Sequence, residues 1–104
     1  MKSKRSKACD ISQKTKKIVF ARDGGACIIC GKSGLPNSHY ISRAKGGLGI
    51  EQNVVTMCIV CHDAYDNGKD AELRDYIKNK TKEYLQLLYK DWNEDNLIYK
   101  KYGN

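Results

Sequence analysis

Two Cys-x-x-Cys motifs constrain this chain more than any other feature of its sequence. They are Cys27-Ile-Ile-Cys30 and Cys58-Ile-Val-Cys61, with 27 residues between them. This spacing lets one tight turn present two thiolates to the same ion, and two such turns complete a closed four-sulfur site for Zn²⁺. Because a chain of 104 residues has a thin apolar core, a bound metal would contribute directly to folding. We therefore predict a structural Zn²⁺ site; the alternative is reduced, metal-free thiols that pack as small apolar side chains.

Charge and hydropathy limit the compartment and the partners. The basic N-terminal segment is not followed by an apolar stretch, so it is not a secretory signal. No apolar run reaches the roughly 20 residues that span a bilayer. We expect an intracellular protein with no membrane partner and with reduced thiols, since a disulfide framework would leave Cys9 over. The formal net charge of +7 favours a polyanionic partner such as nucleic acid, although a solvated basic tail would give the same charge.

The pattern of apolar and turn-forming residues predicts a single α+β domain over residues 10–104, preceded by a disordered basic tail over residues 1–9. Two short antiparallel strands are expected at residues 38–42 and 54–57, on either side of a glycine-rich loop. Helices are expected in three places: from Asp10 or Ser12 to Gly24, from just after Cys58 to Asn67, and from about Asp70 to about Lys90. The last helix carries an apolar stripe at helical spacing: Leu73, Tyr76, Ile77, Tyr84, Leu87 and Leu88.

Both histidines of the chain stand in a fixed register with an asparagine and with the cysteines. Asn53 follows His39 by 14 residues, and His62 follows Asn53 by nine and comes directly after Cys61. A neutral imidazole is a suitable base near pH 7, and a divalent ion nearby can hold a phosphate oxygen and a departing oxygen. Each residue alone has an ordinary structural explanation. Their shared register beside four cysteines points to a catalytic segment.

Residues 27–62 resemble the HNH endonucleases of the ββα-metal class, in particular the small zinc-binding members common in bacteriophage and mobile elements. The resemblance is carried by both Cys-x-x-Cys motifs, Ser38-His39-Tyr40, Gly46-Gly47, Asn53 and His62, and it covers about a third of the chain. It implies a small ββα-metal core on the zinc site, flanked by an N-terminal helix and a long C-terminal helix. It also implies that His39 is the general base, that Asn53 holds the His39 segment through backbone contacts, and that His62 ligates a catalytic Mg²⁺, Mn²⁺ or Ni²⁺. Cleavage would then leave 5′-phosphate and 3′-hydroxyl ends.

The chain departs from this family at one position. The residue before the base is often an acidic or histidine metal ligand, and here it is Ser38, whose neutral hydroxyl is a weak ligand. Asp66 is a substitute, because it lies four residues after His62 on the same helix face and its carboxylate suits Mg²⁺ or Mn²⁺. The alternative interpretation is that Asp66 is an ordinary aspartate at a helix end, with no metal to bind. Arg43 and Lys45 are candidate phosphate contacts, or else ordinary loop charges.

These features predict a metal-dependent DNA endonuclease that nicks DNA or cuts both strands, acting as a monomer or a dimer. The resemblance to phage-type members suggests phage packaging components as further partners and the bacterial host cytoplasm as the location. The alternative is a non-catalytic zinc-binding module that binds nucleic acid or a protein partner. The cysteine motifs, the basic charge and the missing acid at Ser38 all fit that alternative.

Overall fold

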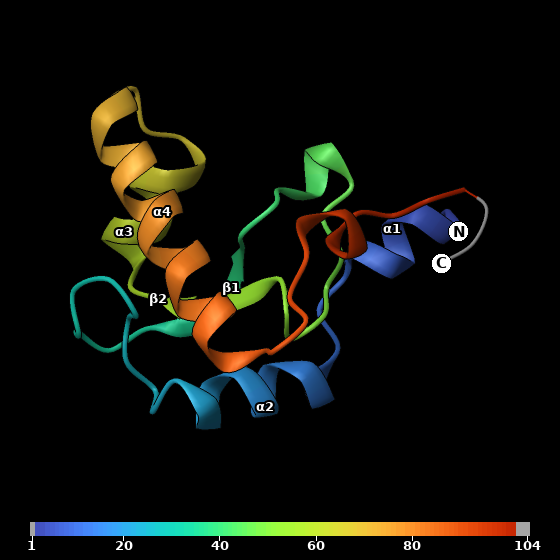
Figure 1. The fold of residues 1–104 in the computed structure, drawn as a ribbon, viewed down its shortest axis with the longest axis horizontal. Helices are drawn as coiled ribbons and strands as arrows, with labels where there is room; N and C mark the ends of the chain where they lie inside the picture. The colour runs from blue at the N-terminus through green and yellow to red at the C-terminus, as the bar shows by residue number, and fades with distance from the viewer. Residues whose placement is uncertain (1, 102–104) are drawn as a thin grey trace.

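The computed structural model of this protein describes residues 2–101 (Figure 1). It contains α-helices, 3-10 helices (η) and two strands, which confirms the predicted α+β class. The elements in chain order are α1 (Lys4–Cys9), α2 (Gln13–Arg22), β1 (Leu35–His39), η1 (Arg43–Lys45), β2 (Val54–Met57), α3 (Ile59–Asp66), α4 (Ala71–Leu88) and η2 (Glu94–Leu97). Within residues 2–101, no helix has both the length and the apolar character needed to cross a membrane.

The two strands form an antiparallel sheet, in which Ser38 pairs with Val55 and His39 pairs with Val54. All of β2 is buried, as its β-branched sequence Val-Val-Thr-Met favours. Helix α2 packs against both strands, and α3 packs against β2 and α4. The first strand begins and ends three residues earlier than predicted. It ends at His39 because the chain beyond Tyr40 turns away from β2 to form the loop that carries η1.

The N-terminal segment differs from its prediction, because residues 4–9 form the helix α1 rather than a disordered tail. The Ser3 side chain accepts a hydrogen bond from the Ser6 N–H and caps this helix. A helix of six residues is too short to persist in water by itself. Contacts with the rest of the chain hold it: Cys9 is buried, and the Gly49 N–H donates to the Ala8 carbonyl at 3.0 Å.

A buried network around Asp23, just after α2, connects this helix to β2 and α4. The Asp23 carboxylate accepts hydrogen bonds from Arg22 Nε at 2.8 Å, from the Tyr84 hydroxyl at 2.6 Å and from the Thr56 N–H at 2.8 Å. Arg22 in turn donates to the Val54 carbonyl at 2.8 Å. The buried charges of Arg22 and Asp23 are therefore hydrogen-bonded to each other and to further polar groups, as a buried ion pair requires. The network fixes the strand that leads into Cys58.

Candidate active site

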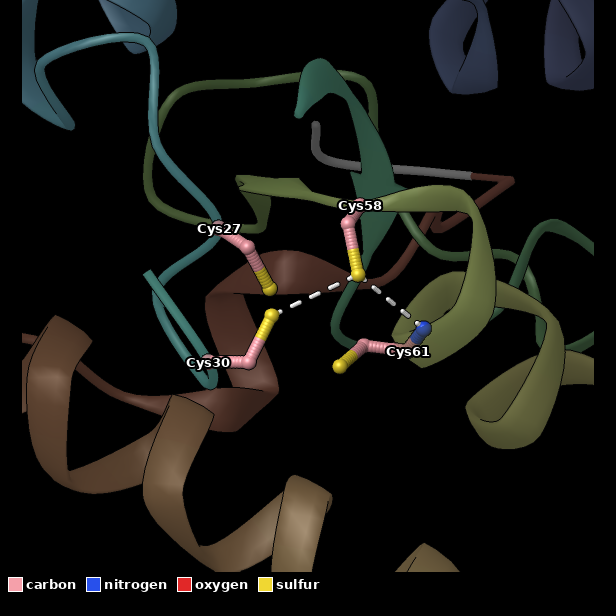
Figure 2. Close-up of side chains that lie close together, drawn as sticks. All are labelled: Cys27, Cys30, Cys58 and Cys61. Carbon is pink, nitrogen blue, oxygen red and sulfur yellow. Dashed lines mark hydrogen bonds between the residues drawn. The ribbon is translucent and has the colours of Figure 1, made fainter. Parts of the chain in front are cut away.

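The four cysteines of the two motifs converge on one point (Figure 2). Their sulfur atoms all lie within 4.8 Å of one another, and Cys30 Sγ lies 3.5 Å from Cys58 Sγ. Zn–S bonds of about 2.3 Å in a tetrahedron place the sulfurs about 3.8 Å apart. The predicted ligand set therefore fits one tetrahedral metal ion such as Zn²⁺. We call it the four-cysteine cluster (Cys27, Cys30, Cys58 and Cys61).

Local backbone structure presents these sulfurs. The first motif lies in a tight turn, in which the Gly31 N–H donates to the Cys27 carbonyl at 2.9 Å and Gly31 has a φ of +81° that favours glycine. The second motif lies at the start of α3, where Cys58 is the N-cap residue. Its Sγ accepts a hydrogen bond from the Cys61 N–H at 3.4 Å. Two short segments thus supply two ligands each.

Electrostatics at the cluster favour a bound cation. Burial opposes ionisation of Cys27, but N–H donors from Cys30, Cys58 and Ile29 outweigh it and lower the pKa of its thiol to about 7. The N–H of Cys61 likewise lowers the pKa of Cys58. Burial and the neighbouring thiols raise the pKa of Cys61 instead. Four adjacent thiolates would repel one another, and a Zn²⁺ ion would remove this conflict by binding all of them.

Both histidines line a single cleft of about 1240 Å³, although His39 comes from β1 and His62 from α3. Asp66 also lines this cleft. Cationic side chains from several elements lie around it: Lys2, Lys16, Arg43, Lys45, Arg74 and Lys78. Three further carboxylates, those of Asp10, Asp75 and Glu94, also line it, so the cleft joins two imidazoles and Asp66 to a rim with more cationic than acidic side chains.

The His39 side chain is buried, with 8% of its surface exposed, and its Nε2 lies 2.8 Å from the Cys9 carbonyl oxygen. A carbonyl oxygen only accepts hydrogen bonds, so Nε2 carries the proton and Nδ1 keeps its lone pair. Burial lowers the pKa of His39, and the nearby Arg43 charge lowers it further, while the bond to Cys9 opposes them. His39 is thus a neutral imidazole near pH 7, with one nitrogen able to accept a proton.

Asn53 is fully buried and bridges the two ends of the loop that follows His39. Its Oδ1 accepts from the Ile41 N–H at 2.8 Å. Its Nδ2 donates to the Ile41 carbonyl at 3.1 Å and to the Leu48 carbonyl at 2.8 Å. These are backbone contacts across the loop of the kind that the resemblance implies. They fix the chain two residues after His39.

His62 and Asp66 contact each other on α3, where His62 Nε2 lies 2.9 Å from Asp66 Oδ2. Both side chains are partly exposed, at 27% and 41%. The predicted shared helix face is therefore present. One imidazole and one carboxylate form a donor set that suits Mn²⁺ or Ni²⁺ at least as well as Mg²⁺. If a cation bound there, Asp66 would be either a second ligand or the acceptor that orients His62.

Ser38 is a correction to the predicted ligand set. Its side chain is fully buried, and its hydroxyl donates to the sulfur of Met57 at 3.3 Å. Successive strand residues face opposite sides of a sheet, so Ser38 faces the core while His39 faces the cleft. Asn37 lines the cleft instead, and its buried Oδ1 has no hydrogen-bond partner within residues 2–101. Period-2 alternation from His39 is the signal that identifies Asn37.

Arg43 and Lys45, the two cationic residues that follow His39, have different surroundings. Arg43 donates from Nη1 to the Cys9 carbonyl at 2.8 Å and from Nη2 to Asp10 Oδ1 at 2.8 Å. Much of its donor capacity is therefore used within the chain. Lys45 is exposed at the rim of the cleft. Of the two, Lys45 is the better placed to meet a phosphate.

Comparison with known proteins assigns no family to this arrangement. No protein-family model, no curated protein and no solved structure matches this chain.

Proposed function

We propose that this protein is a metal-dependent DNA endonuclease of the HNH type. The observation that carries the proposal is the meeting of His39 and His62 in one cleft, although His62 lies 23 positions after His39 in the sequence. The Asn53 contacts and the His62–Asp66 pair add to it. Residues buried in a cleft with perturbed protonation are candidates for catalysis.

His39 would act as the general base in this reaction. Its Nε2 is already committed to the Cys9 carbonyl, so Nδ1 is the nitrogen that accepts a proton from the attacking water. A divalent cation held by His62 and Asp66 would supply positive charge next to a phosphate oxygen and the departing 3′ oxygen. By the family resemblance, the products carry 5′-phosphate and 3′-hydroxyl ends. Asn53 would keep the base in place without contacting DNA.

DNA is the substrate that the charge distribution supports. The cationic side chains around the cleft come from the N-terminal segment, α2, η1 and α4, so they would contact a phosphate backbone at several points. Phosphate contacts of this kind give affinity that falls steeply with salt and carries no sequence information. We therefore expect weak sequence preference at low salt.

The test is cleavage of supercoiled plasmid by zinc-loaded protein with Mg²⁺, Mn²⁺, Ni²⁺ or EDTA, at low salt. Wild type should nick or linearise the plasmid with a divalent ion and not with EDTA. His39→Ala should lose this activity by about 10²- to 10⁴-fold, the usual contribution of a general base. Lys69→Ala is a matched control, since Lys69 is exposed and lies outside the cleft lining. Equal rates for wild type and His39→Ala would refute the proposal.

A non-catalytic zinc-binding module is the second candidate, and the burial of Ser38 favours it. A hydroxyl that faces Met57 removes one protein ligand from the predicted catalytic ion. Such a module should bind one Zn²⁺ and DNA, with no second divalent ion. Calorimetry with Mn²⁺ on zinc-loaded protein separates the two candidates. A weak second site that disappears in His62→Ala supports the nuclease.

A further inference from the structure

We propose that helix α1 is a positioning element for His39, so that docking of this N-terminal helix fixes the imidazole. The catalytic meaning of this contact rests on the proposed function. The acceptor of His39 Nε2 is the carbonyl of Cys9, the last residue of α1, at 2.8 Å. It comes from a segment 30 positions earlier in the sequence, outside the β1–β2–α3 unit.

Several contacts hold this carbonyl against the loop after His39. Arg43 donates to the same Cys9 oxygen at 2.8 Å and pairs with Asp10 at 2.8 Å. The Gly49 N–H bonds the Ala8 carbonyl at 3.0 Å. At the other end of the helix, Arg5 Nη2 donates to the Ala44 carbonyl at 3.0 Å. The end of α1 therefore lies against the loop segment 43–49, at Arg43 and at Gly49.

The approach at Gly49 leaves no room for a side chain. A Cβ atom built on Gly49 would lie 2.0 Å from the Asp10 carbonyl oxygen and 2.9 Å from the Cys9 carbonyl oxygen. Both of these atoms are backbone, so neither can move aside without moving the end of α1. Because a short helix has little stability of its own, displacement from this surface should also unwind it. Gly49→Ala is therefore a substitution that undocks α1.

Nuclear magnetic resonance of ¹⁵N-labelled, zinc-loaded protein tests the contact without reference to activity. In wild type, the His39 Nε2–H proton should be observed directly and should exchange slowly with solvent, because it is buried and bonded. Gly49→Ala should accelerate this exchange at least tenfold. The chain has two histidines, so His39→Ala assigns the signal. Gly24→Ala is the matched control: it strains a left-handed glycine with nothing within 4 Å and should leave the exchange unchanged.

Plasmid nicking gives the second readout. Gly49→Ala should nick about 10- to 100-fold more slowly than wild type, as a base misplaced by roughly 1 Å would, and Gly24→Ala should nick at the wild-type rate. If Gly49→Ala does not fold, Arg43→Gln replaces it in both experiments, because the loss of the guanidinium removes two bonds to the same helix end. Arg43→Gln should accelerate exchange of the His39 Nε2–H proton by a smaller factor than Gly49→Ala.

The outcomes separate the two proposals. An unprotonated His39 Nε2 in wild type would overturn the positioning role, even in a protein that nicks DNA. The positioning role would also be overturned if Gly49→Ala shifts the Cys9 and Asp10 resonances but leaves the exchange rate of the His39 Nε2–H proton unchanged. An unchanged exchange rate of this proton in Arg43→Gln would overturn it too. A protected Nε2–H that Gly49→Ala loses, in a protein that never nicks DNA, would support the contact and refute the nuclease.

Discussion

Replacing Asn53 by alanine should destabilise the fold by an amount that its hydrogen bonds predict. Asn53 makes three hydrogen bonds, to the Ile41 N–H, the Ile41 carbonyl and the Leu48 carbonyl. A hydrogen bond contributes about 0.5–1.5 kcal/mol net, so their loss should lower the free energy of unfolding by about 1.5–4.5 kcal/mol. The buried site gives water little access to the groups left behind, since Asn53 is fully buried. The loss should therefore lie in the upper half of this range.

Urea unfolding at saturating zinc measures this loss. The single tryptophan, Trp92, donates to the Gln52 carbonyl at 2.7 Å and so reports on the adjacent backbone by its fluorescence. Asn53→Asp keeps the acceptor for the Ile41 N–H but sets a carboxylate against two carbonyls, so it should destabilise at least as much. Asn67→Ala removes only an exposed bond to Asp63 and should change stability by less than about 0.5 kcal/mol. A loss as small as this in Asn53→Ala would refute the role of Asn53 in fixing the loop.

Three further predictions concern metals and pH. When a thiol-reactive reagent is added with a colorimetric metal dye, wild type should release one Zn²⁺ per chain. Cys30→Ser should bind zinc weakly and lose its helical circular dichroism signal when a chelator is added. Full zinc retention by Cys30→Ser would contradict the four-cysteine cluster. Asp66→Asn should weaken Mn²⁺ binding in calorimetry by about 10- to 100-fold without zinc loss, whether Asp66 is a ligand or orients His62; unchanged affinity would exclude both roles. Burial lowers the pKa of His39, so this side chain should stay deprotonated at pH values somewhat below about 6.5, the pKa of an ordinary histidine. The nicking rate should therefore stay constant as the pH falls to about 6.5 and decrease only at lower pH. A rate that is already half-maximal above about pH 6.5 would contradict the role of His39 as the base.

Local sequence signals predicted the parts of the fold whose structure is locally determined. The β-branched run at Val54–Met57 is β2 with the predicted bounds, and the helix after Cys58 ends at Asp66, just before Asn67-Gly68. The Cys-x-x-Cys spacing located all four members of the cluster, because each pair lies in one turn whose geometry depends on a few residues. The cleft could be anticipated only from the shared register of the two histidines.

The sequence-based predictions of α1 and of the buried face of α4 are wrong because packing between distant segments determines the structure there. Residues 4–9 have no periodicity, and α1 exists through its contacts with the loop before β2. The apolar stripe of α4 was predicted to include Leu87, which is 87% exposed, and to omit Leu85, which is fully buried. Both leucines fit a helical period, and only the position of the core selects between them. Ser38 is a different kind of error, since the alternation of strand residues already places it on the opposite side of the sheet from His39.

Helix α3 connects the four-cysteine cluster to the proposed catalytic residues. Cys58 and Cys61 lie at its cap and in its first turn, and His62 and Asp66 follow directly. Because a helical turn is rigid over this distance, Zn²⁺ bound to the cysteines would fix the direction of the His62 side chain relative to β2. The His39 segment has contacts of its own, with the Cys9 carbonyl and through the Asn53 bridge. Zinc loss should therefore displace the His62 side of the cleft first, while the His39 side depends on the docking of α1. The two sets of contacts meet through β2, since His39 pairs with Val54 and Cys58 follows Met57, so both histidines are positioned against the same strand.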